Sequence, residues 1–305
     1  MNWKVKKFLC NLLALTAFNR TRRRQIRDNL MFFDFIKQIN IPPVVLPSVP
    51  EKSKTKINIA FCSDKRGIKL MAVTIKSLLN VSQGRCDYNI FCVVDSDIDL
   101  KEKEILEKLV KGSGSSIKFL EPNSDFDKSY LEGWTKAIYY RTMLPELLPD
   151  VDKIIYADID VIFCNDLIEA YNFDMGNNYI AGVKTFADGY INSGFLIMNL
   201  KQIRKDKLYK KWLEVSQRER YPNPDQDLLN YTCQGRILYL PLKYNFQPMD
   251  GANIYKCHSR CEISDIQYHL VVLHFSNWMK PWHDKKKRPI FSDLWWKHAK
   301  QTGLW

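Results

Sequence analysis

The chain has 305 residues, enough for one large or two ordinary domains at roughly 150 residues per domain. Hydrophobic residues make up 46% and charged residues 26%, which excludes a broadly disordered chain. Residues 1–30 hold eight Lys or Arg and one Asp, and residues 280–300 hold seven Lys or Arg and two Asp, so the two ends account for the whole net charge of +12. A nucleic-acid-binding domain would spread its cations over the folded face, so we expect no nucleic-acid partner.

The segment before residue 30 predicts neither a membrane span nor an export signal. Its apolar stretch, residues 8–18, has 11 residues and includes Asn11, against the roughly 20 needed to cross a bilayer. Arginines follow this stretch where an export signal would have small residues. Cysteines such as Cys62, Cys92 and Cys164 lie in apolar runs, where a thiol acts as a small hydrophobe. These features predict reduced cysteines and a cytoplasmic protein.

Four prolines between residues 42 and 50 predict an extended linker, with a domain boundary near residue 52. Beyond it, strand patterns and helix patterns alternate along the chain. We expect strands at residues 57–62, 88–94, 117–120 and 153–163, and helices at residues 68–79, 100–110 and 135–147. This alternation is typical of an α/β domain with a largely parallel sheet. Ligands of such sheets bind outside the carboxyl ends of the strands.

Asp158 and Asp160 stand two positions apart inside the apolar run 154–163. In an extended backbone their side chains point the same way, and two neighbouring buried carboxylates are costly unless a cation holds them. A divalent metal ion resolves this conflict. Another acidic cluster, Asp95, Asp97 and Asp99, leads straight into a predicted helix, so helix capping explains it without a metal.

An apolar stretch from residue 270 ends at His274, and Lys280 follows six positions later. A lone histidine at a strand end is usually structural. Beside a carboxylate pair, however, it supplies a nitrogen ligand that shifts the preference of an oxygen site from Mg²⁺ toward Mn²⁺. Lys280 is placed to reach a phosphate oxygen as a point charge.

Four motifs in order, over roughly residues 57–282, make the chain resemble glycosyltransferase family 8, the retaining bacterial lipopolysaccharide glucosyl- and galactosyltransferases. They are residues 59–64 (IAFCSD), the pair Tyr140 and Arg141 followed by residues 156–160 (YADID), residues 192–200 (NSGFLIMNL), and residues 274–282 (HFSNWMKPW). Residues 225–230 (DQDLLN) also resemble the start of the donor-side helix of that family. The resemblance implies a GT-A fold, an α/β architecture with a mostly parallel central sheet and flanking helices.

The resemblance also implies a UDP-sugar donor, a saccharide acceptor and a role for each motif residue. Asp158, Asp160 and His274 would bind Mn²⁺, with Mg²⁺ as the alternative. The donor would contact Asp64 through its uracil ring, Arg141, Asp158 and Lys280 through its diphosphate, and Asn192 and Gly194 through its sugar. The catalytic candidates are Asp225 and Gln226, which would face the sugar hydroxyls or the anomeric centre.

Several alternatives stay open at this point. Asp225 and Gln226 follow Asn223 and Pro224, so they could merely satisfy the free backbone N–H groups of a helix start. Asn277 stands where the family has glycine before its lysine-proline-tryptophan motif. Glucose and galactose are equally compatible donors, and retention is compatible with either front-face attack or a double displacement. The acceptor residues of the family do not transfer to this chain.

Both ends of the chain combine cations with large apolar side chains, which predicts reversible attachment to an anionic membrane surface. We therefore divide the chain into an N-terminal segment and linker (residues 1–52), a catalytic domain (53–282) and a basic aromatic tail (283–305). An enzyme held at the cytoplasmic face of the inner membrane would meet a lipid-linked saccharide such as a lipopolysaccharide core. The alternatives are a soluble acceptor, a catalytically silent membrane-surface protein, or ends whose apolar residues pack on the domain.

Overall fold

The computed structural model describes residues 32, 35–36, 39, 54–82, 84–129, 133–186, 188–276, 278–283 and 288–305. Most of the predicted N-terminal segment and linker, the lysines at 285–287 and Asn277 lie outside the described residues. Phe32 and Ile36 are buried in the main core, and the Phe32 ring centroid lies 5.6 Å from that of Tyr255. Within the described part of the chain, no helix has both the length and the apolar character of a membrane span.

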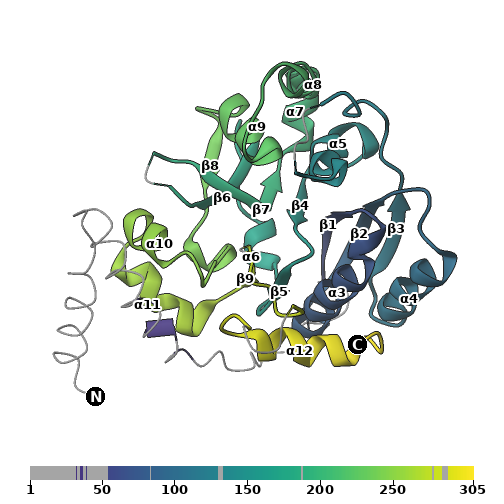
Figure 1. The fold of residues 1–305 in the computed structure, drawn as a ribbon, viewed down its shortest axis with the longest axis vertical. Coiled ribbons are helices and arrows are strands. Elements are labelled where there is room, and N and C mark those ends of the chain that lie inside the picture. Colours follow the sequence, from purple (N-terminus) through teal and green to yellow (C-terminus); the bar gives the residue numbers. More distant parts are fainter. Residues whose placement is uncertain are drawn as a thin grey trace.

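A seven-stranded sheet forms the centre of the molecule (Figure 1). Its strands are β1 (Thr55–Ser63), β2 (Cys86–Val94), β3 (Ser116–Leu120), β4 (Ile154–Ala157), β6 (Ile180–Lys184), β7 (Ile191–Met198) and β8 (Ile237–Tyr239). They lie side by side in the order β3-β2-β1-β4-β7-β6-β8. Only the two pairings that β7 makes, with β4 and with β6, are antiparallel. The predicted mostly parallel sheet is therefore confirmed.

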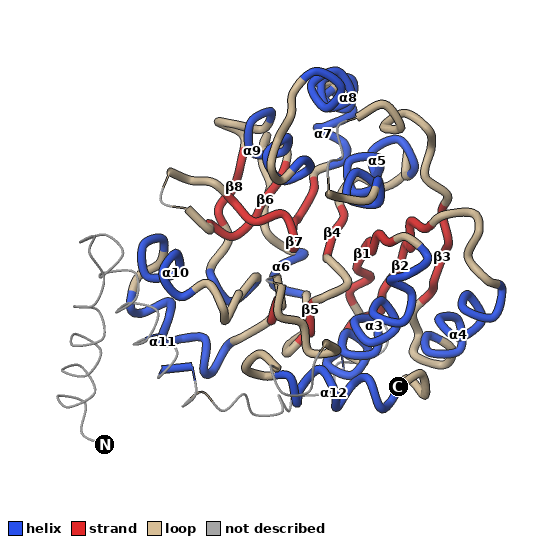
Figure 2. Tube along the Cα trace, in the orientation of Figure 1, coloured by secondary structure: helices blue, strands red, loops and turns tan. Residues whose placement is uncertain are grey.

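Helices cover both faces of this sheet (Figure 2). The α-helices are α3 (Ile68–Ser82), α4 (Leu100–Val110), α5 (Tyr140–Leu147), α6 (Ile168–Tyr171), α7 (Leu200–Lys205), α8 (Leu208–Arg218), α9 (Pro224–Thr232), α10 (Gly251–Cys257), α11 (Arg260–His269) and α12 (Ser292–Gln301). The short 3-10 helices are η2 (Lys65–Gly67), η3 (Lys136–Tyr139) and η4 (Leu242–Tyr244). The helix predicted at 135–147 thus begins as η3 and continues as α5.

Strand β1 is buried on both faces, because successive side chains of a strand point in opposite directions. Ile59 and Phe61 belong to the core cluster that includes α3, whereas Ala60 and Cys62 belong to the cluster that includes α5. This double burial is the reason that the strand reads as a continuous apolar run rather than an alternating one.

The strand predicted at residues 153–163 is not continuous. β4 ends at Ala157, and β5 (Val161–Phe163) leaves the large sheet to pair antiparallel with β9 (Val272–His274). The two halves pair with different partners, so the chain turns between residues 158 and 160. The prediction that Asp158 and Asp160 share one extended strand was therefore wrong. The turn lies at the carboxyl end of β4, where such sheets bind their ligands.

The C-terminal tail packs on the domain through α12. Trp295 is fully buried in the main core, and its ring contacts those of Trp282, Trp296 and Trp305. Asn80 of α3 contacts both His298 and Gln301 of α12. Trp295 therefore fills the edge of the domain, as the alternative interpretation of the tail expects.

Candidate functional site

Asp158, Asp160 and His274 come together beyond the carboxyl end of β4. Strand pairing explains their meeting, because Val161 of β5 lies opposite His274 of β9, and the Phe275 backbone N–H donates to the Asp160 carbonyl at 3.0 Å. The His274 Nε2 lies 3.2 Å from Asp160 Oδ1 and 3.8 Å from Asp158 Oδ2. One ligand atom of each residue lies within 4.8 Å of the others, the only such group among the described residues.

A chain of amide side chains determines which His274 nitrogen faces the carboxylates. The Gly194 backbone N–H donates to Asn192 Oδ1 at 2.9 Å, so this oxygen is an acceptor and also accepts from Asn245 Nδ2 at 2.8 Å. The Asn245 Oδ1 then faces His274 Nδ1 at 2.8 Å, which assigns the proton of a neutral ring to Nδ1. The lone pair of Nε2 therefore points toward Asp160, as a metal ligand requires.

Asp160 has one oxygen that is paired and one that is not. Lys280 Nζ lies 2.6 Å from Asp160 Oδ2 and 2.5 Å from the Phe275 carbonyl oxygen. Burial alone would raise the pKa of Asp160, but Lys280 and His274 together outweigh it and hold the pKa well below its usual range. The other oxygen, Oδ1, is buried without a hydrogen-bond partner. An ionised carboxylate, an open oxygen and an unprotonated imidazole nitrogen fit a divalent cation.

Gly194 lies against these same side chains. A Cβ at this position would stand 2.1 Å from His274 Cε1 and 2.8 Å from Asp158 Oδ2. The Gly194 carbonyl also accepts the Asp158 backbone N–H at 2.9 Å. From the sequence we expected the missing side chain of Gly194 to let a donor sugar come close. In the structure, His274 and Asp158, two of the candidate metal ligands, occupy the space where that side chain would stand.

The Arg141 guanidinium is buried between two carboxylates. It lies 2.8 Å from Asp158 Oδ1 and 3.2 Å from Asp225 Oδ2, and it donates to the Ser193 carbonyl at 2.8 Å. It also stacks over the Tyr156 ring, 4.4 Å from the centroid. Burial would lower the pKa of Arg141, but Asp158 and Asp225 raise it, so the group stays charged. Arg141 therefore links the candidate metal centre to helix α9.

Asp225 and Gln226 occupy the first turn of α9 and contact the start of β7. Asp225 Oδ2 accepts from Ser193 Oγ at 3.0 Å. Gln226 Oε1 accepts from Asn192 Nδ2 at 2.9 Å and from the Ser193 backbone N–H at 3.0 Å. A different acid, Asp227, accepts the Asn223 backbone N–H at the helix start. Burial raises the pKa of Asp225, although Arg141 opposes it.

Two predicted features are not linked to this cluster by the contacts described. Asp64 accepts the Arg66 backbone N–H at 3.0 Å and pairs with the Arg66 side chain, at the end of β1. Asp99 caps α4 as expected, whereas Asp95 accepts the Tyr140 hydroxyl instead. Capping therefore explains only part of that acidic cluster. Asp95 and Tyr140 line a small pocket of about 180 Å³ beside the ends of β2 and β3.

Sequence reasoning missed Asn245 and Tyr156. Asn245 is fully buried and orients His274, but it follows η4 in a segment outside the sequence motifs. Tyr156 donates its hydroxyl to Asp158 Oδ1 at 2.6 Å, and it lies in an apolar strand where an aromatic residue is expected for packing alone.

Residues 58–286 match the family model described as glycosyl transferase family 8. The chain is 26% identical over 255 residues to the lipopolysaccharide glucosyltransferase WaaO of Escherichia coli K12, which covers 75% of this chain and 73% of that protein. Its structure is similar to that of the galactosyltransferase LgtC, solved with donor and acceptor sugar analogues, with a TM-score of 0.68, 23% identity, and coverage of 80% of this chain and 96% of LgtC. GlyE of Streptococcus pneumoniae TIGR4 gives a TM-score of 0.66 at 23% identity, with coverage of 81% and 60%. These structural likenesses confirm the predicted GT-A fold.

Proposed function

Because this chain belongs to glycosyl transferase family 8, we propose that it transfers a hexose, glucose or galactose, from a UDP-sugar with retention of configuration. The convergence of Asp158, Asp160 and His274 beyond β4 is the observation that carries this proposal. These residues would hold Mn²⁺, with Mg²⁺ as the alternative. The ion would stabilise the negative charge that develops on the leaving diphosphate.

Three further motif residues, Lys280, Arg141 and Gly194, lie against the side chains of that centre. Lys280 is bonded to Asp160, and an incoming diphosphate would offer its ammonium a second anionic partner. Arg141 contributes fixed positive charge behind Asp158. We assign the donor sugar to the region of Asn192 and Gly194.

The uracil and catalytic assignments follow the family resemblance. We assign the uracil ring to Asp64, at the end of β1. Asp225 and Gln226 are the catalytic candidates, because their contacts with the start of β7 fix them close to the donor-sugar region.

We propose a lipid-linked saccharide, such as a lipopolysaccharide core, as the acceptor. The relative WaaO is a lipopolysaccharide glucosyltransferase, which supports this class. In the proposed division, residues 1–52 attach the catalytic domain (53–282) to the anionic cytoplasmic face of the inner membrane, with the basic aromatic tail (283–305) beside it. We expect anionic liposomes to bind the full chain in a salt-sensitive way. Equal binding after deletion of residues 1–50 would exclude the N-terminal segment as the anchor.

The enzymatic proposal is tested by incubating the protein with Mn²⁺ and either UDP-glucose or UDP-galactose and measuring UDP release. Slow hydrolysis of the donor requires no knowledge of the acceptor. We expect release with at least one sugar and its loss in EDTA or in the Asp160→Asn variant. Asp152→Asn is the matched control, since Asp152 precedes the same strand β4 at its opposite end and its carboxylate is 64% exposed.

Undiminished release in EDTA would contradict the metal assignment. Absence of release from both sugars would contradict the proposed donor and would favour a binding protein that retains the fold.

A further inference from the structure

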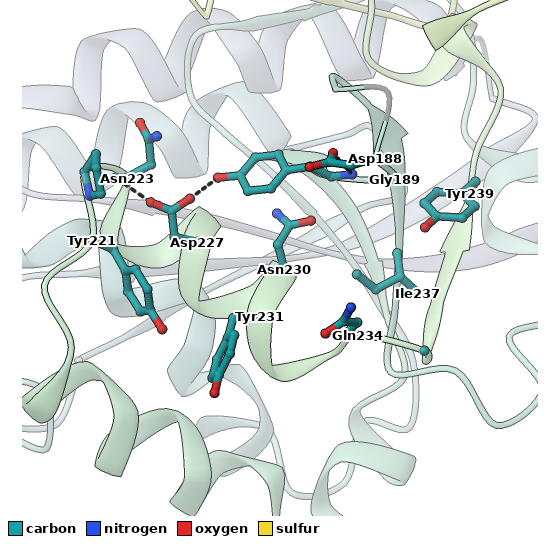
Figure 3. A pocket seen from close by; sticks show the side chains of 13 residues that line it. Asp188, Gly189, Tyr221, Asn223, Asp227, Asn230, Tyr231, Gln234, Ile237 and Tyr239 are labelled. Carbon is teal, nitrogen blue, oxygen red and sulfur yellow. Dashed lines mark hydrogen bonds between the residues drawn. The ribbon is translucent and has the colours of Figure 1, made fainter.

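A pocket of about 530 Å³ lies against the outer face of α9, within the roughly 300–1,000 Å³ range of small-molecule sites (Figure 3). Its walls come from the segment before β7, the segment before α9, α9 itself and β8. Asp227 and Asn230 of the motif at residues 225–230 line the pocket, but none of the individual residues assigned to the donor does.

Aromatic rings and uncharged polar groups dominate the lining. Four tyrosines line it, namely Tyr190, Tyr221, Tyr231 and Tyr239. Tyr231 is 61% exposed and Tyr239 is 46% exposed, and the Tyr221 and Tyr231 rings lie side by side with centroids 6.5 Å apart. A sugar ring has C–H faces that pack on aromatic rings, and hydroxyl groups at its rim that bond to polar side chains.

The polar groups of the lining are acceptors and amides. They come from Asp188, Asp227, Asn223, Asn230 and Gln234. The described residues that line the pocket include no Lys, Arg or His. A nearby cation is Lys184, whose Nζ lies 4.1 Å from the centroid of the Tyr239 ring and outside the lining. A phosphate or carboxylate ligand would face the two acidic side chains of the lining, whereas the hydroxyl groups of a neutral sugar can donate to them.

The pocket shares a wall with the candidate catalytic residues. The Tyr190 hydroxyl, which lines the pocket, donates to Asp227 and accepts from Gln226 Nε2 at 3.1 Å. The other end of the Gln226 amide is bonded to the start of β7. If the reacting hydroxyl of a saccharide lies near Gln226, the pocket is next to it on the side of α9, beyond Tyr190.

We propose that this pocket binds neutral sugar residues of the acceptor, distal to the hydroxyl that receives the hexose. The inference rests on the proposed function and deepens it by assigning an acceptor subsite and its chemical class. Tyr231 and Tyr239 are the platforms, with the Lys184 ammonium over one face of the Tyr239 ring. The acids and amides of the lining bond the sugar hydroxyls.

The test is binding of the full chain, without donor, to an array of neutral, phosphorylated and sulfated oligosaccharides. We expect retention of neutral oligosaccharides, and about tenfold weaker affinity for the strongest of them in Tyr231→Ala and in Tyr239→Ala, as for an aromatic anchor in a binding site. Tyr268→Ala is the matched control, since Tyr268 is 68% exposed on α11 and does not line the pocket. Melting temperatures of all three variants check that each is folded.

Failure to bind any neutral oligosaccharide, a preference for the phosphorylated or sulfated ones, or equal affinity in the two pocket variants and the wild type would each overturn the inference. UDP release by the wild-type chain is measured separately and without acceptor. An active donor hydrolase whose saccharide binding ignores Tyr231 and Tyr239 would refute the subsite and leave the proposed function standing.

Discussion

Substituting Gly194 by alanine should abolish tight Mn²⁺ binding while the protein still folds. The new Cβ would stand 2.1 Å from His274 Cε1, whereas carbon atoms in contact are about 3.5–4.0 Å apart. The imidazole or the β7 backbone must therefore shift by about 1.4 Å, which exceeds the roughly 0.5 Å tolerance of a preorganised site. We expect Mn²⁺ affinity to fall about 100-fold or more.

Gly182→Ala is the matched control, because it adds the same methyl group to the same sheet. There the nearest atoms are the ends of flexible side chains, Ile191 Cδ1 at 2.6 Å and Leu196 Cδ2 at 3.1 Å. Both variants should lose about 1–3 kcal/mol of unfolding free energy through overpacking. Only Gly194→Ala should lose the metal.

Titration of free Mn²⁺ by electron paramagnetic resonance measures the affinity, and urea denaturation measures the stability. Wild-type Mn²⁺ affinity in Gly194→Ala, or an equal loss in Gly182→Ala, would refute the argument that Gly194 is needed for the position of His274.

Four further predictions concern the groups around this centre. Asn245→Ala should weaken Mn²⁺ binding about 10- to 100-fold in the same titration, and Asn245→Asp, which keeps an acceptor for His274 Nδ1–H, should lose less. Lys280→Ala should lower kcat/KM about 100-fold. Arg141→Ala should cost about 3–5 kcal/mol in urea denaturation, because it leaves two carboxylates without their buried cation. Burial raises the pKa of Asp225, so its carboxyl group binds a proton more tightly in the folded chain than in the unfolded chain. Ionisation of Asp225 therefore lowers the free energy of unfolding as pH rises above about 4. In Asp225→Asn, the free energy of unfolding should fall less than in the wild type between about pH 4 and pH 7, and an identical pH dependence would contradict this.

The alternation of strands and helices was predictable because burial leaves a local pattern in the sequence. Strands β1 and β2 and helices α3 and α4 lie at the predicted positions, apart from two or three residues at their ends. The grouping of Asp158, Asp160 and His274 was predictable for a related reason, because charged or titratable side chains next to buried strands are costly unless something pairs with them.

The break between β4 and β5 was not predictable, because it depends on pairing with segments far along the chain. β4 pairs with β1 and β7, whereas β5 pairs with β9, more than 100 residues later. An apolar run gives no sign of which partner each half will meet. Asn245 was hidden for the same reason, since its role depends on a histidine that is close in space and 29 positions away in sequence.

Two separate routes connect helix α9 to the candidate metal centre. One runs through charges, from Asp225 to Arg141 and on to Asp158. The other runs through neutral amides, from Gln226 to Asn192 and Asn245 and then to His274 Nδ1. Rotating the Asn245 amide would place two donors against each other, so each amide fixes the orientation of the next. The Nε2 of the Gln226 amide takes no part in this route and donates to the Tyr190 hydroxyl, which lines the pocket. The same amide that helps to fix His274, a candidate metal ligand, therefore also forms the boundary with the proposed acceptor subsite.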